Sequence, residues 1–329
     1  MSKDVFKIQD LEAGKGERVK GYLKIAEKPA GLYQIPIMIL NGSGEGPVLL
    51  INGGEHGSEY NGPAACLRLM KELDPKEING TVILVPMVNT LAFEARWMHG
   101  NPFDYRDLSR CYVSEIPQGG SGVPLLSYQI ATTFYKDVIS KAQYRINLHG
   151  GDIEEDLNET ITYRKTGDDP ERDEIGLGMA RNFGIQYIRE SLPRPGRKPP
   201  SLKMPISIIT EAGGMGRCQS DFVDRTFKGC INVMKYLKMM EGEPDIPPTA
   251  EVYNTYALYA KRGGLFISYV RAGDAVEEGQ KIGEIKDLFG EVVEELFAST
   301  DGIVDMIFSP SIFEGDYLIG IGKNLRTIT

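Results

Sequence analysis

The stretch from Leu49 to Pro63, LLINGGEHGSEYNGP, constrains this chain more than any other. It begins as an apolar run, breaks at Asn52-Gly53-Gly54, and presents His56 and Glu59 just before an amphipathic helix expected to begin near Asn61. Residues three apart in a helical turn lie on the same face, so the imidazole and the carboxylate can share one cation. The sequence therefore predicts a strand that delivers two metal ligands into a turn.

A third ligand is expected from His149, one of only three histidines in the chain. It stands in YRINLHGGD, where an apolar run again ends at glycines. An HxxE motif alone is more often a solvated helix start, but the matching context of His149 favours a metal site. Two histidines and one glutamate with an open position are typical of catalytic zinc, whereas structural zinc sites are closed and rich in thiolates. We predict one Zn²⁺ per chain, held by His56, Glu59 and His149. His99 has no neighbouring ligand in the sequence, and we interpret it as lining a loop or pocket.

Composition narrows the class of protein. With 329 residues, 41% of them hydrophobic, the chain is long enough to bury a large core. A net charge of -9 without basic patches argues against partners such as nucleic acid or an anionic membrane surface. No terminal segment resembles a signal peptide, and no apolar run reaches the length of a membrane span. We expect a soluble, cytoplasmic protein that acts on a small molecule and is a possible homo-oligomer.

The order of the predicted elements indicates the fold class. A strand, a helix over Asn61–Leu73 and a strand over Thr81–Val88 form a βαβ unit, which implies a parallel sheet with functional groups at the carboxyl ends of its strands. We therefore predict an α/β fold with a mixed, mostly parallel sheet and helices on both faces. Further helices are expected over Val123–Ala142, Pro170–Phe183 and Gln219–Met240, and further strands over Tyr33–Leu40, Tyr144–Leu148, Ile161–Tyr163, Ile185–Ile188 and Ile206–Thr210. Between Asn89 and Ser121 we expect a long, functional loop.

Three regions are predicted along the chain: N-terminal strands over residues 1–45, a catalytic domain over 46–243, and a small all-β domain over 250–329. The segments AGDAVEEGQKIGEI and STDGIV of the last region resemble the barrel-sandwich of lipoyl and biotinyl domains. Phe289 occupies the hairpin position where those domains carry a modified lysine. The resemblance implies a structural relative without a swinging arm.

Five motifs together, GGEHGSE, VNTLAFEAR, RDLSR, LHGGD and ITEAGG, resemble the succinylglutamate desuccinylase and aspartoacylase family. The family's enzymes are deacylases on a zinc-carboxypeptidase scaffold. The resemblance implies that His56, Glu59 and His149 bind zinc, that Glu211 is the general base or acid, and that Arg110 grips a substrate carboxylate. The family commonly has Asn-Arg where this chain has Ser109-Arg110, and the position of its upstream arginine falls near His99. These differences concern the substrate rather than the chemistry.

The expected chemistry uses the metal to make the nucleophile. Zn²⁺ with two neutral imidazoles and one carboxylate keeps a net positive charge, which polarises an amide carbonyl and lowers the pKa of a bound water towards about 7. Glu211 can accept the proton of that water and pass it to the leaving amine, a role typically worth about 10² to 10⁴ in rate. Alternatively, Glu211 is the N-cap partner of a following helix.

The candidate substrate-binding residues are Arg110, Asn89, Arg106 and Ser109, all at the start of or within the long loop. Structural roles remain open for two of them. Arg110 can pair with Asp107 on the surface, and Asn89 can simply cap a turn.

We predict a zinc-dependent deacylase that hydrolyses the amide bond of a small N-acyl amino acid. The alternatives are a metallocarboxypeptidase acting on peptides and a protein on the same scaffold with a binding or regulatory role. An acidic run after His149, Asp152 to Glu159, is usually a solvated loop. Beside a cleft it would attract cations, which leads to the hypothesis of a substrate with a free amine, such as an N-acyl diamino acid.

Overall fold

The computed structural model describes residues 4–113, 125–192 and 202–329. The end of the expected long loop, residues 114–121, and the expected helix start at Val123 lie outside the described residues. Within the described ranges, no helix combines the length and the apolar character needed to cross a membrane.

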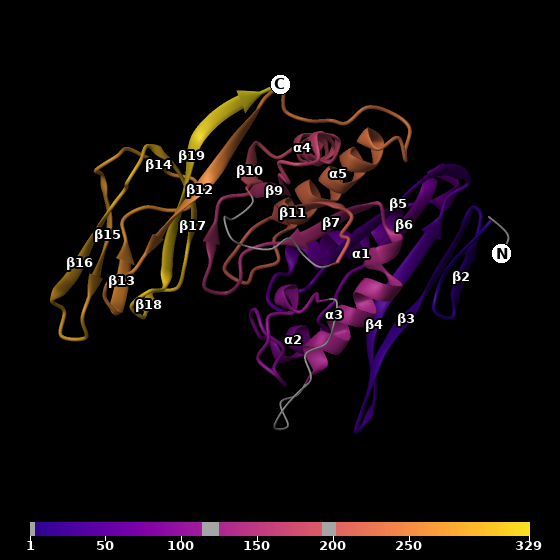
Figure 1. The fold of residues 1–329 in the computed structure, drawn as a ribbon, viewed down its shortest axis with the longest axis horizontal. Helices are drawn as coiled ribbons and strands as arrows, with labels where there is room; N and C mark the ends of the chain where they lie inside the picture. The colour runs from indigo at the N-terminus through magenta and orange to yellow at the C-terminus, as the bar shows by residue number, and fades with distance from the viewer. Residues whose placement is uncertain (1–3, 114–124, 193–201) are drawn as a thin grey trace.

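Four neighbouring parallel strands form the centre of the fold. Strand β5 (Gly44–Gly53) leads through a turn into helix α1 (Asn61–Glu72), and the chain returns in β6 (Asn79–Val85), parallel to β5. Strand β7 (Tyr144–His149) lies parallel on the other side of β5, and β11 (Ile206–Glu211) lies parallel to β7. The predicted βαβ unit is confirmed, and the carboxyl ends of β5, β7 and β11 share one edge of the sheet (Figure 1).

The sheet extends in both directions from this centre. Its other strands are β3 (Glu17–Lys28), β4 (Gly31–Asn41), β8 (Asp156–Leu157), β9 (Thr160–Arg164), β10 (Tyr187–Ser191), β12 (Ala250–Tyr259), β14 (Ala275–Val276), β17 (Gly302–Ile307) and β19 (Tyr317–Ile328). On one side β4 and β3 follow β6 in antiparallel order, and on the other side the order continues β9, β10, β12, β19, β17, β14. Beyond the central strands, parallel pairs such as β9 with β10 occur together with antiparallel ones such as β9 with β11. The sheet is mixed, as predicted.

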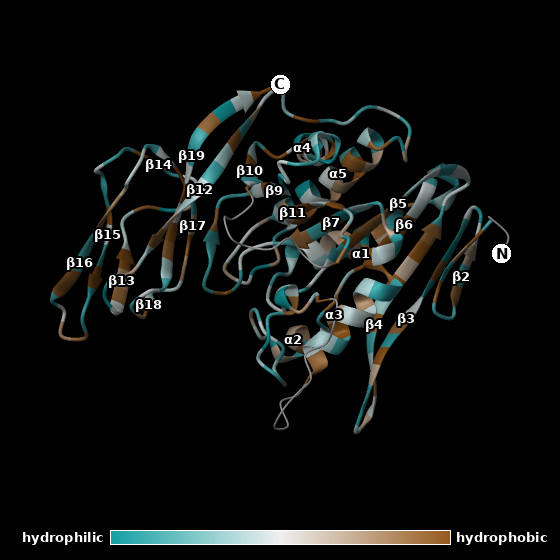
Figure 2. Cartoon of the chain, viewed as in Figure 1, coloured by the Kyte–Doolittle hydropathy of each residue, from teal (hydrophilic) through white to brown (hydrophobic). Residues whose placement is uncertain are grey.

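Helices cover both faces of the sheet, and successive side chains of a strand point alternately into the two cores. In β6, Val82 and Leu84 pack with α1, α4 (Pro170–Phe183) and α5 (Ser220–Tyr236), whereas Ile83 and Val85 face the opposite core. That second core contains residues of α2 (Thr90–Ala95), of α3 (Leu126–Asp137) and of a hairpin of β1 (Val5–Ile8) and β2 (Leu11–Gly14). Figure 2 shows teal and brown segments along α3 and α5, as expected for helices with one buried face.

Helix boundaries follow local signals. Helix α4 spans the predicted Pro170–Phe183: the Asp169 side chain accepts a hydrogen bond from the Arg172 amide at 3.1 Å, and Gly184 ends the helix with a φ of 93°. Helices α3 and α5 end earlier than predicted. Val138 leaves the helical region at ψ -64° and φ -124°, and Lys238 turns left-handed at φ 57°, so each helix stops one turn before its apolar pattern does. The described residues also include the short 3₁₀ turns η1 (Pro75–Glu77), η2 (Leu108–Arg110) and η3 (Ile139–Lys141).

The C-terminal region is rich in antiparallel β structure and has its own hydrophobic core. A four-stranded sheet of β13 (Gly264–Ser268), β15 (Lys281–Lys286), β16 (Val292–Phe297) and β18 (Ser311–Ile312) lies outermost, and Phe289 is 94% exposed in the β15–β16 hairpin. Strand β12 joins this region to the catalytic sheet by pairing in parallel with β10. The division into domains at residue 250 stays a prediction.

A buried polar cluster holds the two regions together. Asp305 of β17 is fully buried and accepts a hydrogen bond from Arg189 of β10 at 2.9 Å, from Thr255 at 2.9 Å, and from the Tyr253 hydroxyl. Thr160 of β9 lies 3.1 Å from the same Tyr253 hydroxyl. The Asp305 carboxylate raises the pKa of the Arg189 guanidinium, although burial opposes the charge. One ion pair between β10 and β17, together with hydroxyl hydrogen bonds from β12, therefore fixes how the C-terminal strands meet the catalytic sheet.

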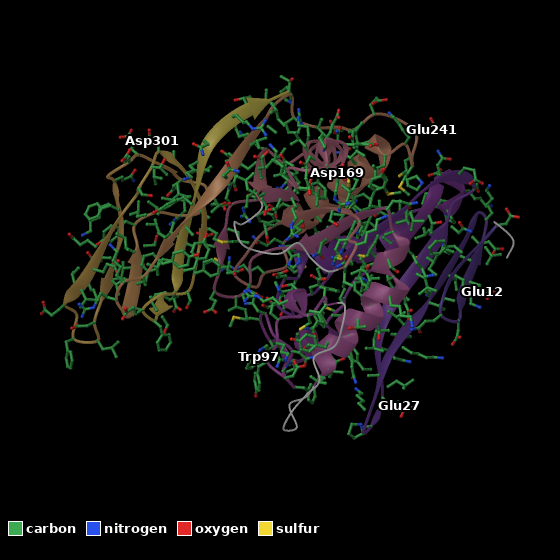
Figure 3. All side chains as sticks on the ribbon, in the orientation of Figure 1. Glu12, Glu27, Trp97, Asp169, Glu241 and Asp301 are labelled. Atoms are coloured by element: carbon green, nitrogen blue, oxygen red, sulfur yellow. The ribbon has the colours of Figure 1, made fainter. Side chains whose placement is uncertain are left out.

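We expect Asp305→Ala to lower the free energy of unfolding by about 3 to 5 kcal/mol, because it leaves the Arg189 charge buried without a partner. Urea unfolding followed by circular dichroism measures this loss. Asp301→Ala is the matched control: Asp301, labelled in Figure 3, is exposed and accepts one backbone hydrogen bond, so its loss should cost no more than about 1 kcal/mol. Equal effects of the two substitutions would contradict a special role for Asp305.

Candidate functional site

The structure brings His56, Glu59 and His149 together. One Glu59 oxygen lies 2.5 Å from His56 Nδ1, and the other lies 2.9 Å from His149 Nδ1. The two imidazole rings stand edge to face with centroids 4.9 Å apart. One nitrogen of each ring and one Glu59 oxygen all lie within 4.8 Å of one another. The three predicted ligands therefore converge on one point.

The charges in this cluster favour a bound cation. Glu59 Oε2 is buried and makes no hydrogen bond of normal geometry. Burial opposes the charge of Glu59, but His56 and His149 overcome it and hold the pKa of the carboxyl below its usual range. Burial also disfavours a charged His149, yet the Glu59 carboxylate raises the pKa of the ring to about 10. A divalent cation would supply the positive charge this carboxylate attracts while leaving both rings neutral, and two nitrogens with one oxygen are ligands that Zn²⁺ accepts.

Strand ends and a tight turn position these ligands. His149 is the last residue of β7, and His56 lies in the turn between β5 and α1. Gly54 adopts a φ of 66° in that turn, a left-handed conformation that glycine tolerates. A side chain at Gly57 would collide with the backbone of Ala92 and Trp97, so glycine there lets the loop after α2 approach His56.

Each imidazole has a second carboxylate behind it. His56 Nε2 lies 3.4 Å from Asp107 Oδ1. His149 Nε2 lies 3.5 Å from Glu55 Oε2, with the Asn147 side-chain nitrogen nearer, at 2.8 Å. Burial alone would raise the pKa of Asp107, but its hydrogen bond to His56 lowers it to about 2. Carboxylates of this kind fix the orientation of metal-binding imidazoles. Both rings can thus present Nδ1 to the centre of the site.

Glu55 belongs to a buried network that the sequence reasoning missed. Its carboxylate accepts hydrogen bonds from Arg145 at 2.6 Å, from the Tyr112 hydroxyl at 2.6 Å and from Asn147 at 3.1 Å. Asn52 of β5 donates to Asn147 at 2.7 Å. A signal was available: Arg145, Asn147 and His149 alternate with apolar residues in YRINLH, which places three polar side chains on one face of a buried strand.

Glu211 faces the same site from the neighbouring strand. It ends β11 directly beside His149 in the register of the parallel pair, so the two side chains share one face of the sheet. Among the described residues, no hydrogen bond or ion pair holds its carboxylate. Burial raises the pKa of Glu211 to about 7, although His149 and Arg189 oppose this shift. The predicted acid or base is therefore present as an uncommitted carboxyl group beside the ligands.

The interpretation of His99 as a residue without a fellow ligand was wrong. Its Nε2 lies 3.1 Å from Asp152 Oδ2, and its ring centroid lies 4.8 Å from that of His56. Nitrogens of His56 and His99 and one Asp152 oxygen also lie within 4.8 Å of one another, as a second possible ligand set. Sequence spacing did not reveal this contact because residues 99 and 152 meet only through folding of the two loops that carry them.

The candidate substrate-binding residues are placed differently. Asn89 is buried, caps α2 by accepting from the Ala92 amide at 3.2 Å, and donates to the Glu55 carbonyl at 3.3 Å. The Arg106 guanidinium lies 5.1 Å from the Tyr128 ring centroid. Ser109 is exposed, and its amide donates to Asp107. Arg110 is 84% exposed and forms the expected surface pair with Asp107 at 3.0 Å. A capping role for Asn89 and a surface pair for Arg110 are thus present, and substrate binding by these four residues stays a prediction.

We expect His56→Ala, Glu59→Ala and His149→Ala each to abolish tight zinc binding, because three ligands are the minimum for such a site. Metal content after dialysis, measured by atomic emission, gives the result. His99→Ala should keep its zinc, and this control separates the first ligand set from the second. Retention of stoichiometric zinc by the His149 variant would refute the assignment.

Arg110→Lys should mainly raise KM for substrates with an α-carboxylate, because lysine keeps the charge but loses the planar fork that binds a carboxylate at two points. The measurement compares kinetics on an N-acyl amino acid and on its α-carboxamide. An equal rise in KM for both compounds would show that Arg110 acts only through its pair with Asp107.

Comparisons with known proteins identify the family and the fold. The succinylglutamate desuccinylase/aspartoacylase catalytic domain matches residues 45–237. The N-alpha-acetyl-L-2,4-diaminobutyric acid deacetylase of Halomonas elongata is 27% identical, over 94% of this chain and 92% of that protein. The crystal structure of a succinylglutamate desuccinylase/aspartoacylase from Rhodobacter sphaeroides superimposes with a TM-score of 0.79 and 25% identity, covering 93% of this chain and 95% of that one.

A second solved structure shows the same fold. The product-bound ectoine utilization protein EutE (DoeB) from Ruegeria pomeroyi superimposes with a TM-score of 0.82 and 22% identity, covering 98% of this chain and 99% of that one. The match of the catalytic domain covers most of the residues from β5 to α5 and includes every predicted ligand as well as Glu211. The chain therefore belongs to the succinylglutamate desuccinylase/aspartoacylase family of deacylases, as its motifs predicted.

Proposed function

We propose that this protein is a zinc-dependent amidohydrolase that removes the acyl group from a small N-acyl amino acid. The observation that carries the proposal is the convergence of His56, Glu59 and His149, with the uncommitted carboxyl of Glu211 beside them. Family membership supports the deacylase activity. Among the named relatives are desuccinylases, aspartoacylases and a deacetylase, which favours this activity over a peptide carboxypeptidase or a binding protein.

Each residue of the candidate site has its own role in the proposed reaction. His56, Glu59 and His149 would hold Zn²⁺, which would polarise the amide carbonyl and make water a better nucleophile at neutral pH. Glu211 accepts the proton from the attacking water as the C–O bond forms. It then donates that proton to the amine nitrogen as the C–N bond breaks, which gives a carboxylic acid and an amine. The acid ionises and its proton passes to the amine, so the final products are a carboxylate and an ammonium group. Asp107 and Glu55 keep the two imidazoles in position.

The substrate class follows from charge. Asp152 and Glu155 are buried, and both contact His99, whose ring lies next to that of His56. His99 is the residue near which the resemblance expected an arginine. A second substrate carboxylate, as in an acylated dicarboxylic amino acid, would meet repulsion there, whereas an ammonium group would be attracted. The name of the Halomonas elongata relative, a diaminobutyric acid deacetylase, supports the same class. We extend the proposal to an N-acyl diamino acid with a free side-chain amine.

Glu211→Gln should keep zinc and fold but lose at least about 10²-fold in kcat, because an amide cannot accept the proton. The pH profile of kcat/KM gives a second readout. Glu211 acts as a base only when ionised, so activity rises with pH through its pKa of about 7, or lower once a bound cation adds its field. The variant should lack this rise. Near-normal turnover would remove Glu211 from the mechanism, and loss of zinc would make it a ligand.

A further inference from the structure

Two carboxylates beside the metal-ligand cluster are buried without a full set of partners. Asp152 is 0% exposed: the Ser58 hydroxyl donates to its Oδ1, while its Oδ2 makes no hydrogen bond of normal geometry. Glu155 is also buried, and its Oε2 accepts a hydrogen bond from the Asp152 amide at 3.0 Å. Two negative groups side by side in a buried place require a cation.

In the structure His99 stands where that cation is needed. Its Nε2 lies 3.1 Å from Asp152 Oδ2 and 3.4 Å from Glu155 Oε1, so one imidazole nitrogen faces both carboxylates. His99 is itself 42% exposed, whereas the carboxylates are buried. The ring therefore covers the pair from the solvent side, and a ligand entering from that side meets His99 first.

A second metal ion fits this pair less well than an organic cation. The second ligand set includes His56, but His56 Nδ1 already faces Glu59 and its Nε2 faces Asp107. A second ion sharing His56 would have to displace Asp107. An ammonium group needs no third ligand, because it donates up to three hydrogen bonds to oxygens such as Asp152 Oδ2 and Glu155 Oε1.

We propose that Asp152 and Glu155 bind the side-chain ammonium of the substrate, with His99 occupying their oxygens in the free protein. This inference rests on the proposed deacylase function and names the residues that select its substrate. Within the acidic run after His149, it assigns the role to Asp152 and Glu155, whereas Glu154 is exposed.

Distance adds a limit on side-chain length. An Asp152 oxygen lies within 4.8 Å of a His56 nitrogen, so the ammonium must reach close to the scissile amide. In an α-acylated 2,4-diamino acid, four bonds of about 1.5 Å separate the two nitrogens, a span of about 5 Å when extended. Lysine adds two bonds, or about 2.5 Å. The pair therefore suits a short diamino acid better than lysine.

The test compares two substrates of nearly equal shape, N-α-acetyl-2,4-diaminobutyrate and N-acetyl-norvaline, in which a methyl group replaces the ammonium. The zinc-loaded wild type should prefer the ammonium substrate in kcat/KM. Asp152→Asn keeps an acceptor for Ser58 but removes the charge, and should lose about 10- to 100-fold on the ammonium substrate and less than about 3-fold on N-acetyl-norvaline. Glu155→Gln should show the same bias, and the matched control Glu154→Gln should change neither value.

His99→Arg gives an independent check, because an arginine fixed on both carboxylates would exclude the ammonium. We expect this variant to lose its preference for the ammonium substrate and to gain relative activity on N-acetyl-aspartate. Equal losses of kcat/KM on N-α-acetyl-2,4-diaminobutyrate and N-acetyl-norvaline in Asp152→Asn would overturn the inference. Asp152 would then be a structural support of the turn at Ser58. A second bound zinc ion lost in Asp152→Asn would overturn it as well.

Calorimetry with the amine products separates this inference from the proposed function. Wild-type protein should bind 2,4-diaminobutyrate at least about 10-fold more tightly than norvaline, and Asp152→Asn should abolish the difference. If that holds while no N-acyl amino acid is hydrolysed, the proposed function fails and the ammonium site stands. If hydrolysis is found and the two products bind equally to wild type and variant, the ammonium site fails and the deacylase stands.

Discussion

The Glu59 carboxylate between two imidazoles is the interaction on which the site depends. A buried carboxylate is costly unless positive charge compensates it, and here His56 and His149 reach it from a turn and from a strand end. Their meeting requires β5 and β7 to pair in a fixed register, since a slip of one residue would turn His149 to the opposite face. Strand register therefore decides whether these three side chains can converge.

The two faces of the central sheet differ in polarity. The face under α1, α4 and α5 is apolar, with Ile146, Leu148 and Ile208 in its core. The other face of the same strands carries the buried polar side chains of β7 and the partly buried Glu211. Hydrogen bonds satisfy most of these polar groups, whereas the Glu211 carboxylate has no hydrogen-bond partner among the described residues. Groups left uncommitted in a satisfied network are the ones available for chemistry.

Electrostatics at the rim distinguish this chain from the general pattern of its family. His99 lies where the resemblance expected an arginine, and it faces Asp152 and Glu155 at 3.1 and 3.4 Å. Burial raises the pKa of Asp152 to about 6, and the Glu59 charge adds to this shift. The raised pKa means that the Asp152 carboxylate is destabilised, so a cation bound beside it would be favoured, whereas an arginine in place of His99 would already supply that charge. Substrate choice can change in this way while the ligand set stays the same.

Local sequence signals determined the βαβ unit and the bounds of α4. They also pointed to the three candidate ligands and Glu211, because each of these residues ends a strand or follows it within a short turn. Only the tertiary structure decided which side chains surround them. Glu55 meets Arg145 across 90 residues, and His99 meets Asp152 across two loops. Periodicity shows which face of a strand a residue occupies, but the partner across the sheet follows from strand order and register. Loop contacts such as that of His99 follow no period, so the residues that select a substrate were the least predictable.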